Sequence, residues 1–167
     1  MNKNLLMGAA GIMFVAAGGA SAAELVKVAS FVSPKSIGVT KVIKPWMEKV
    51  RADIGSSAEL KGFWGGSLGK SPVKQYELVK NGVADVAWIL PGYTAGQFPE
   101  MQIVELPFLV DNANEAGLVV QRLHDAGHQT GLGAVKLLGA WATSPNLLFI
   151  NKPVKSVADL KNLKIFM

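Results

Sequence analysis

Two histidines with helical spacing are the first residues that could do chemistry. His124 and His128 stand four residues apart with Asp125 between them, so a helix would place both imidazole rings on one face, as metal-binding helices do. The segment lacks the glutamate of the zinc-protease helix, and Gly127 indicates that the helix ends within it. Two ligands without a third make a weak metal site. We therefore predict a solvated helix end and no bound metal.

A glycine-rich loop at Gly65–Gly69 precedes an expected helix, an arrangement that can bind phosphate. A nucleotide-binding loop needs a glycine five residues before the glycine of its Gly-Lys-Ser ending, and Trp64 occupies that position. Gly131 and Gly133 also fail the dinucleotide pattern, because Lys136 stands where a third glycine is required. The sequence therefore predicts no nucleotide cofactor.

No set of residues in the sequence resembles a catalytic centre. The chain has no cysteine, which excludes thiol nucleophiles, cysteine zinc sites and disulfides. It has no Gly-x-Ser-x-Gly motif, and its 12 carboxylates are scattered. Asp85 lies in an apolar run and is expected to be a hydrogen-bonded structural carboxylate, since buried charges are usually paired. We predict that the protein is not an enzyme.

Aromatic residues offer a better candidate site. Phe31, Trp64, Trp88 and Tyr93 each lie near the expected carboxyl end of a strand. Four aromatic side chains around one crevice would suit a small organic ligand. The alternative is that Trp64 and Trp88 serve the core, because aromatic side chains often do.

Alternating elements are expected to position these residues. Short runs rich in valine, alanine and aromatic residues predict buried strands at Glu24–Val32, Ala58–Trp64 and Val83–Leu90. Helical periodicity or helix-stop signals predict helices at Ile37–Ile54, Pro72–Asn81 and Asn112–Ala126. A further strand-like run, Val135–Ile150, is broken by Ser144-Pro145-Asn146, and Gln97–Leu109 is irregular. Ser36 can cap the first helix, which Pro45 either kinks or divides.

Strands that alternate with helices predict an α/β protein with a mainly parallel sheet. In such sheets ligands bind beyond the carboxyl ends of the strands. The loops after Val32, Trp64 and Leu90, and the turn at Ser144–Asn146, are therefore the expected ligand-binding edge.

The composition and the N-terminus indicate an exported globular chain. Of 167 residues, 17% are charged, which disfavours a disordered chain. The net charge is +5, and the sequence contains no basic run that would favour nucleic acid binding.

Residues 1–22 predict a cleavable signal peptide: Lys3 precedes the apolar run Leu5–Ala17, and Ala20-Ser21-Ala22 is a cleavage site. An uncleaved membrane anchor is the alternative, but the glycine and alanine of its second half supply little transfer energy. We expect residues 23–167 to form the mature domain.

Four stretches then occur in a recognisable order. They are Leu68-Gly69 with Tyr76–Asp85, Phe98-Pro99-Glu100 with Glu105–Leu109, Leu138-Gly139 with Asn151–Ser156, and Asp159–Ile165. This ordered set resembles the periplasmic solute-binding proteins of TRAP (tripartite ATP-independent periplasmic) transporters, the DctP-like family. Each stretch alone is a weak motif, whereas the ordered set is specific and spans essentially the whole mature chain.

The resemblance implies an α/β fold that forms the first lobe of a two-lobed type 2 periplasmic-binding protein. It implies a periplasmic protein that grips a small organic acid, such as a dicarboxylate, between its lobes and delivers it to the membrane permease subunits. Neither catalysis nor a cofactor is implied. The resemblance places ligand contacts at Phe31, Ser33, Trp88, Tyr93 and Asn146.

Two departures from the family pattern stand out. The family's carboxylate-binding arginine would fall at Phe166, which cannot form the paired hydrogen bonds of a guanidinium, and Asn162 replaces a glycine. The sequence also stops near the start of the second lobe, so it looks truncated, and such a chain is expected to bind organic acids poorly or not at all. The alternatives are a non-functional fragment and an exported α/β enzyme that uses His124 and His128 to hold a metal.

Overall fold

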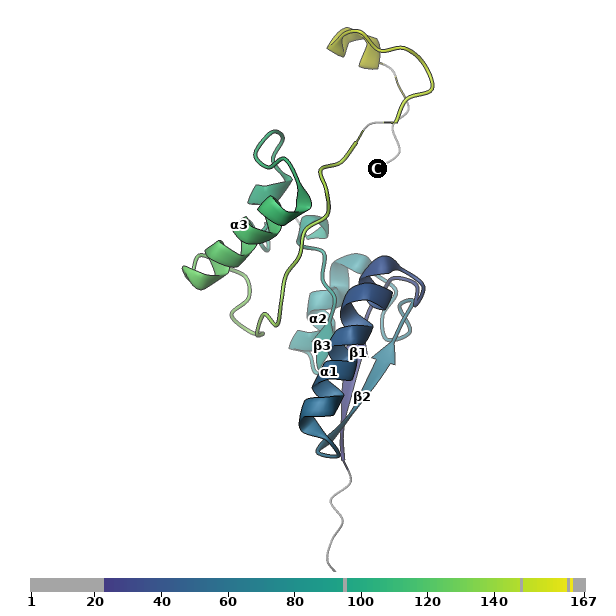
Figure 1. The fold of residues 1–167 in the computed structure, drawn as a ribbon, viewed down its shortest axis with the longest axis vertical. Helices are drawn as coiled ribbons and strands as arrows, with labels where there is room; N and C mark the ends of the chain where they lie inside the picture. Colours follow the sequence, from purple (N-terminus) through teal and green to yellow (C-terminus); the bar gives the residue numbers. More distant parts are fainter. Residues whose placement is uncertain (1–22, 95, 148, 162, 164–167) are drawn as a thin grey trace, which may run out of the picture.

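A three-stranded parallel sheet forms the centre of the N-terminal part of the molecule (Figure 1). The computed structural model describes residues 23–94, 96–147, 149–161 and 163. The strands are β1 (Glu24–Ala29), β2 (Ala58–Phe63) and β3 (Val86–Ala87), in the spatial order β2-β1-β3. Glu24 lies opposite Ala58, and Val28 lies opposite Val86, so both pairings run in parallel. This arrangement confirms the predicted α/β class.

Three α-helices accompany the strands in the described part of the chain. They are α1 (Lys44–Ile54), α2 (Gln75–Lys80) and α3 (Ala113–Asp125). A π-helical segment, η1 (Gly38–Ile43), leads into α1, and a 3₁₀ turn, η2 (Pro72–Lys74), leads into α2. Further 3₁₀ turns are η3 (Pro91–Tyr93), η4 (Ile103–Glu105) and η5 (Val157–Leu160). In Figure 1, α3 lies away from the sheet, and the chain after it returns between α3 and the strands.

The first predicted helix forms as one helical run that changes from π to α geometry at Lys44, next to Pro45. Pro45 is the second residue of α1, and the wider π turn before it accommodates a residue that has no N–H to donate. Ser36 starts this helical segment: its Oγ accepts a hydrogen bond from the Val39 N–H at 3.4 Å, and its carbonyl accepts from the Thr40 N–H at 2.9 Å.

The principal core lies between α1 and the sheet. Its buried members are Val28, Val39, Ile43, Met47 and Leu60. These residues come from β1, η1, α1 and β2, so the apolar face of the amphipathic helix is the face that covers the strands. A second contact joins α2 to the loop that follows η3, where the rings of Tyr76 and Phe98 meet edge to face at 5.4 Å.

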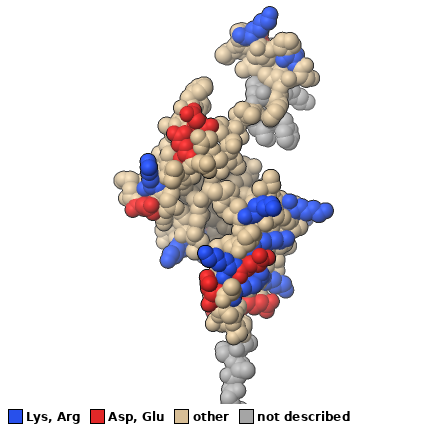
Figure 2. Space-filling model, in the orientation of Figure 1, with Lys and Arg blue, Asp and Glu red and all other residues tan. Residues whose placement is uncertain are grey.

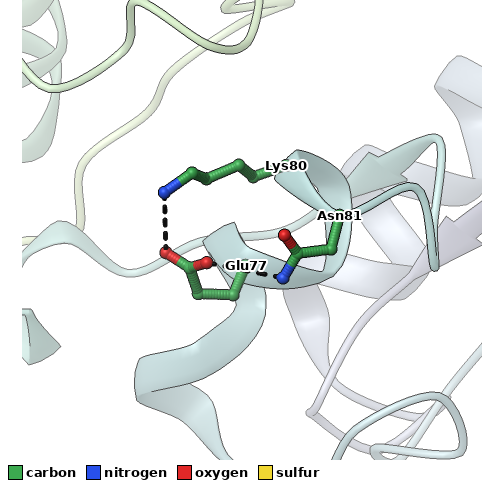
Figure 3. A network of polar contacts seen from close by, with 3 residues as sticks. All are labelled: Glu77, Lys80 and Asn81. Carbon is green, nitrogen blue, oxygen red and sulfur yellow. Dashed lines mark hydrogen bonds and ion pairs between the residues drawn. The ribbon is translucent and has the colours of Figure 1, made fainter.

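Polar contacts close the C-terminal end of α2 (Figure 3). Lys80 Nζ lies 3.8 Å from Glu77 Oε1, and Asn81 Nδ2 donates to Glu77 Oε2 at 3.5 Å. Gly82 follows with φ +70°, a left-handed conformation that glycine adopts without strain. The ion pair is about half exposed, so it contributes little to stability and marks a helix end rather than a site.

The third strand is shorter than predicted, because a side chain replaces part of its ladder. Only Val86–Ala87 is strand, whereas Val83–Leu90 was expected. Asp85 Oδ2 accepts a hydrogen bond from the Lys27 N–H at 2.7 Å, and the Asp85 N–H donates to the Lys27 carbonyl at 3.0 Å. Asp85 is thus a structural carboxylate, as predicted, although its side chain is exposed rather than buried.

The prediction of a strand at Val135–Ile150 is wrong for the residues that the structure describes there. Residues 135–147 and 149–150 contain no strand. A strand needs a partner for its backbone groups, and this run lies at the surface, with Leu147 75% exposed. A run of apolar residues alone therefore did not make a strand here.

The last described element is a capped turn. Ser156 and Asp159 form a reciprocal capping box at the start of η5. Hydrogen bonds from the backbone N–H groups of Lys155 and Ser156, and then from the Ser156 hydroxyl, hold the pKa of Asp159 below its ordinary value.

Three features of the sequence lie outside the described residues: the predicted signal peptide at residues 1–22, Asn162, and Phe166, which stands where the family's arginine would fall. Among the described residues, no helix is both long enough and apolar enough to cross a membrane.

Candidate functional site

Four aromatic rings meet beyond the carboxyl ends of β1 and β3, and we call them the aromatic cluster. The ring centroids of Phe31 and Trp88 are 6.1 Å apart, and those of Phe31 and Tyr93 are 6.4 Å apart. The ring of Trp141 lies 5.3 Å from that of Trp88. All three pairs are tilted, at 39° to 49°, which is ordinary geometry for packed aromatic side chains. The structure therefore brings together Phe31, Trp88 and Tyr93, as the sequence predicted, and adds Trp141.

The two strands position the first two rings directly. One residue, Ser30, separates Phe31 from the end of β1. The Ser30 N–H donates a hydrogen bond to the Phe63 carbonyl at 2.9 Å. Trp88 follows β3, and its N–H donates to the Ala29 carbonyl at 3.1 Å. Adjacent parallel strands end at the same edge of the sheet, so their following residues are neighbours. The parallel pairing thus creates the Phe31–Trp88 contact.

Turn η3 positions Tyr93. Pro91 opens this turn with a backbone suited to a first helical residue, and the Tyr93 N–H donates to the Leu90 carbonyl at 3.1 Å. The turn reverses the chain immediately after the third strand and returns Tyr93 to Phe31. Tyr93 remains 55% exposed, so much of its ring is free to contact a ligand.

Trp88 serves both the cluster and the core. It packs against the principal core, and its six-membered ring lies over the Cα of Gly38. Trp64, by contrast, packs against the same core and covers Gly62. Both tryptophans therefore pack against the core, as one interpretation expected. Trp88 alone of the two also joins the aromatic cluster.

Ser33 and Asn146 are exposed and are not shown to join the cluster. Ser33 Oγ accepts a hydrogen bond from the Lys35 N–H at 3.2 Å, a local turn contact. Asn146 lies in the segment of residues 135–147, which returns past α3 (Figure 1). Ligand contacts at these two positions stay predictions.

Sequence reasoning missed Trp141 because its role depends on a distant contact. Trp141 lies between Ala140 and Ala142 in the run expected to be a strand, and 53 positions separate it from Trp88 (141 − 88). The only sign in the sequence that Trp141 could have a special role was that it is a lone tryptophan among small residues. Trp141 also lines an open hollow of about 450 Å³ between its own segment and the first two turns of α3, including Leu118.

The glycine-rich loop at residues 65–69 supports the edge of the sheet. The Gly65 N–H donates to the Val32 carbonyl at 2.8 Å, and the Gly66 N–H donates to the Ser30 carbonyl at 3.0 Å. Gln75 is buried, and its Nε2 donates to the carbonyls of Gly69 and Ser71 at 2.9 Å each. These contacts use the loop's own backbone to hold the segment around Phe31 in place.

The Phe-Pro-Glu stretch anchors the loop that follows α3. Phe98 is fully buried, and the Glu100 carboxylate accepts hydrogen bonds from the Thr130 hydroxyl at 2.7 Å and the Thr130 N–H at 3.1 Å. The Thr130 hydroxyl is the main cause that lowers the pKa of Glu100. Gly131 adopts φ +81°, and a Cβ there would lie 3.1 Å from the Phe98 ring. The stretch is thus structural in this chain.

The histidine pair lies at the end of α3. His124 Nδ1 forms a hydrogen bond with Gln129 Oε1 at 3.1 Å, and both histidines are exposed. Within the described ranges, no group of three or more histidine, aspartate or glutamate side chains is arranged to hold a metal ion.

Charged groups surround the aromatic cluster only loosely. Lys35, Lys70 and Lys74, three candidate cations for a ligand carboxylate, are all exposed. Figure 2 shows lysine and arginine interspersed with acidic side chains over the lower part of the molecule, and a group of acidic side chains in its upper part. The shared chemistry of the cluster is that of flat apolar rings.

Solved structures of similar proteins share this fold. A TRAP solute binding protein of an unidentified microbe from a marine metagenome, specific for aromatic acid ligands and crystallised with 3-hydroxybenzoate, is 30% identical with a TM-score of 0.73. That match covers 85% of this chain and 45% of the other. A TRAP solute binding protein from Rhodoferax ferrireducens T118, in complex with copurified benzoate, is 38% identical with a TM-score of 0.50, over 53% of this chain and 28% of the other.

A third likeness supports the fold alone. A TRAP periplasmic solute binding protein from Bordetella bronchiseptica, with bound (R)- and (S)-mandelate, is 24% identical with a TM-score of 0.69. The match covers 83% of this chain and 44% of that protein. This chain therefore spans less than half the length of each of these three relatives. Because the family model for the bacterial extracellular solute-binding proteins of family 7 (DctP) matches residues 28–166, the chain belongs to this family.

Proposed function

We propose that this protein is the solute-binding component of a TRAP-type transporter, and that it captures a small aromatic carboxylate and delivers it to membrane permease subunits. The observation that carries the proposal is the aromatic cluster at the carboxyl edge of the sheet, where α/β proteins bind ligands. Family membership supports the solute-binding role. Signal peptide cleavage near Ala22 would place the protein in the periplasm.

The chemistry of the cluster favours aromatic over aliphatic acids. Offset or edge-on contacts between aromatic rings add about 0.5–1.5 kcal/mol beyond the burial of area. Two of the similar proteins bind benzoate and 3-hydroxybenzoate, which have a ring and one carboxylate. The expectation of a dicarboxylate was therefore too specific, and an aromatic monocarboxylate replaces it in the proposal.

The carboxylate of the ligand needs hydrogen-bond donors. Ser33 and Lys35 follow Phe31 closely in sequence and are exposed, so they are the proposed donors on this side of the ligand. Asn146 is proposed as a polar contact from the returning segment. No step of bond making is involved, because ring packing and hydrogen bonding are sufficient for capture.

A titration with matched acids tests the function. Isothermal calorimetry or ligand-observed NMR would follow benzoate, 3-hydroxybenzoate and succinate with the full chain. We expect saturable binding of the two aromatic acids and weaker binding of succinate. Equal binding of succinate would contradict the aromatic preference, and no binding of any acid would contradict the solute-binding role of this chain.

Export is tested separately. Expression of the full gene in a Gram-negative host, followed by osmotic-shock fractionation and mass measurement, should yield a periplasmic protein that begins at Ala23 or the adjacent residue. A protein that keeps residues 1–22 and stays with the membrane fraction would favour the anchor alternative.

A further inference from the structure

We propose that Trp141 contacts the ligand and sets the preference for an aromatic ring over an aliphatic one. This inference rests on the proposed function and assigns a specificity-determining residue to the same site. The sequence motifs and the family resemblance did not point to this position.

The first step of the argument is where Trp141 is placed. Its ring lies 5.3 Å from that of Trp88, closer than any other ring pair of the cluster. Trp141 thereby extends the line of rings from Tyr93 through Phe31 and Trp88 to a fourth member. Three rings come from the loops after β1 and β3, whereas Trp141 approaches from the segment after α3.

The second step is how Trp141 is held. The Val135 N–H donates to the Leu132 carbonyl at 2.9 Å, and the backbone of residues 136–147 forms no hydrogen bond within the described part of the chain. Trp141 is nonetheless 41% exposed, less than Leu138 and Leu147 of the same segment. Packing of the indole against Trp88 therefore contributes to the position of this segment.

The third step is what lies beside the ring. Trp141 lines the open hollow, and Leu118 of α3 lines it as well. Leu118 is 57% exposed, so an apolar surface is available on that side too. The other three rings of the aromatic cluster do not line this hollow. A flat ring that lies against the aromatic cluster would contact the exposed part of the indole. An aliphatic ring of similar size would bury comparable area but would lack the aromatic contact.

The experiment compares two acids that differ in aromaticity. Benzoate and cyclohexanecarboxylate have the same number of carbon atoms and the same carboxylate. Their affinities for the full chain would be measured by isothermal calorimetry for the wild type, Trp141→Leu and Trp141→Phe. Trp46→Phe is the matched control, because Trp46 lies in α1, packs against the principal core and does not belong to the aromatic cluster.

The expected result is a change in the ratio of affinities. The wild type and Trp46→Phe should prefer benzoate, Trp141→Leu should lose about fivefold in that preference, and Trp141→Phe should retain most of it. Circular dichroism and a thermal melt of each variant would establish that it is folded.

Other outcomes overturn the inference in distinguishable ways. If Trp141→Leu is folded and keeps the wild-type ratio, or weakens both acids equally, Trp141 does not set the preference although the proposed function stands. If Trp141→Leu binds benzoate more tightly, the indole competes with the ligand and the inference is wrong. If the folded wild type binds neither acid, the proposed function and the inference fall together.

Discussion

The ring of Trp88 packs over the Cα of Gly38. A Cβ at Gly38 would lie 2.8 Å from Cζ3 of the indole, closer than real side-chain contacts allow. Gly38 belongs to the π-helical segment before α1, whereas Trp88 follows β3. The absence of one side chain in a helix thus gives a ring of the aromatic cluster its position.

Gly38→Ala should therefore destabilise the protein and displace the Trp88 ring. We expect a loss of about 1–2 kcal/mol in the free energy of unfolding, because an added methyl group in a packed site forces neighbours to move. Urea unfolding would measure the loss. Gly117→Ala in α3 is the control: a Cβ there meets no atom within 4 Å, so helix propensity should make it neutral or slightly stabilising. Equal effects of the two changes would contradict the packing argument.

Tyr93→Ala should weaken binding of aromatic acids and leave the fold intact. Tyr93 is 55% exposed and its ring packs against Phe31, so truncating it should lower the free energy of unfolding by about 1 kcal/mol and leave the protein folded. The lost ring contact with the ligand should lower benzoate affinity by about three- to tenfold. Calorimetry of the variant would check this. A stable variant with wild-type affinity would remove Tyr93 from the site.

Glu100 should make stability depend on pH in the acid range. Its pKa is lowered chiefly by the Thr130 hydroxyl, so the folded protein holds the carboxylate charged at pH values where the unfolded chain takes up a proton. The contribution is fully present above the unfolded pKa of about 4.3, and it is lost as pH falls through the lower folded pKa. Chemical unfolding from neutral pH to about pH 3 should show a shallower fall for Glu100→Gln than for the wild type. Identical slopes for both proteins would show that the Thr130 contact does not persist in solution.

Asn112→Ala should destabilise α3 by about 1 kcal/mol. Asn112 Oδ1 accepts a hydrogen bond from the Glu115 N–H at 3.0 Å, which satisfies one free donor at the start of the helix. Asn114→Ala is the matched control, because Asn114 lies exposed in the first turn and alanine is the better helix former. Urea unfolding of both variants should show the loss for Asn112 alone.

Local signals in the sequence determined much of this fold. The helix predicted at Asn112–Ala126 agrees with α3 to within a residue at each end, because amphipathic spacing and capping act over a few residues. The first two strands were predicted near their observed bounds, since their valine and leucine residues face the core. The parallel arrangement then predicted that Phe31, Trp64, Trp88 and Tyr93 would lie around one crevice. Phe31, Trp88 and Tyr93 do lie near one another, whereas Trp64 packs against the core.

Contacts between distant residues decided the rest. The third strand begins only at Val86 because the Asp85 side chain takes up a backbone donor of Lys27, 58 positions away. The run at residues 135–147 has strand-like residues but no backbone partner in the described part of the chain, so it forms no strand there. Trp141 joins the aromatic cluster only because the chain turns back after α3 and places it against Trp88. Residue type and spacing determine local elements, whereas hydrogen-bond partners and ring neighbours depend on which segments tertiary packing brings together.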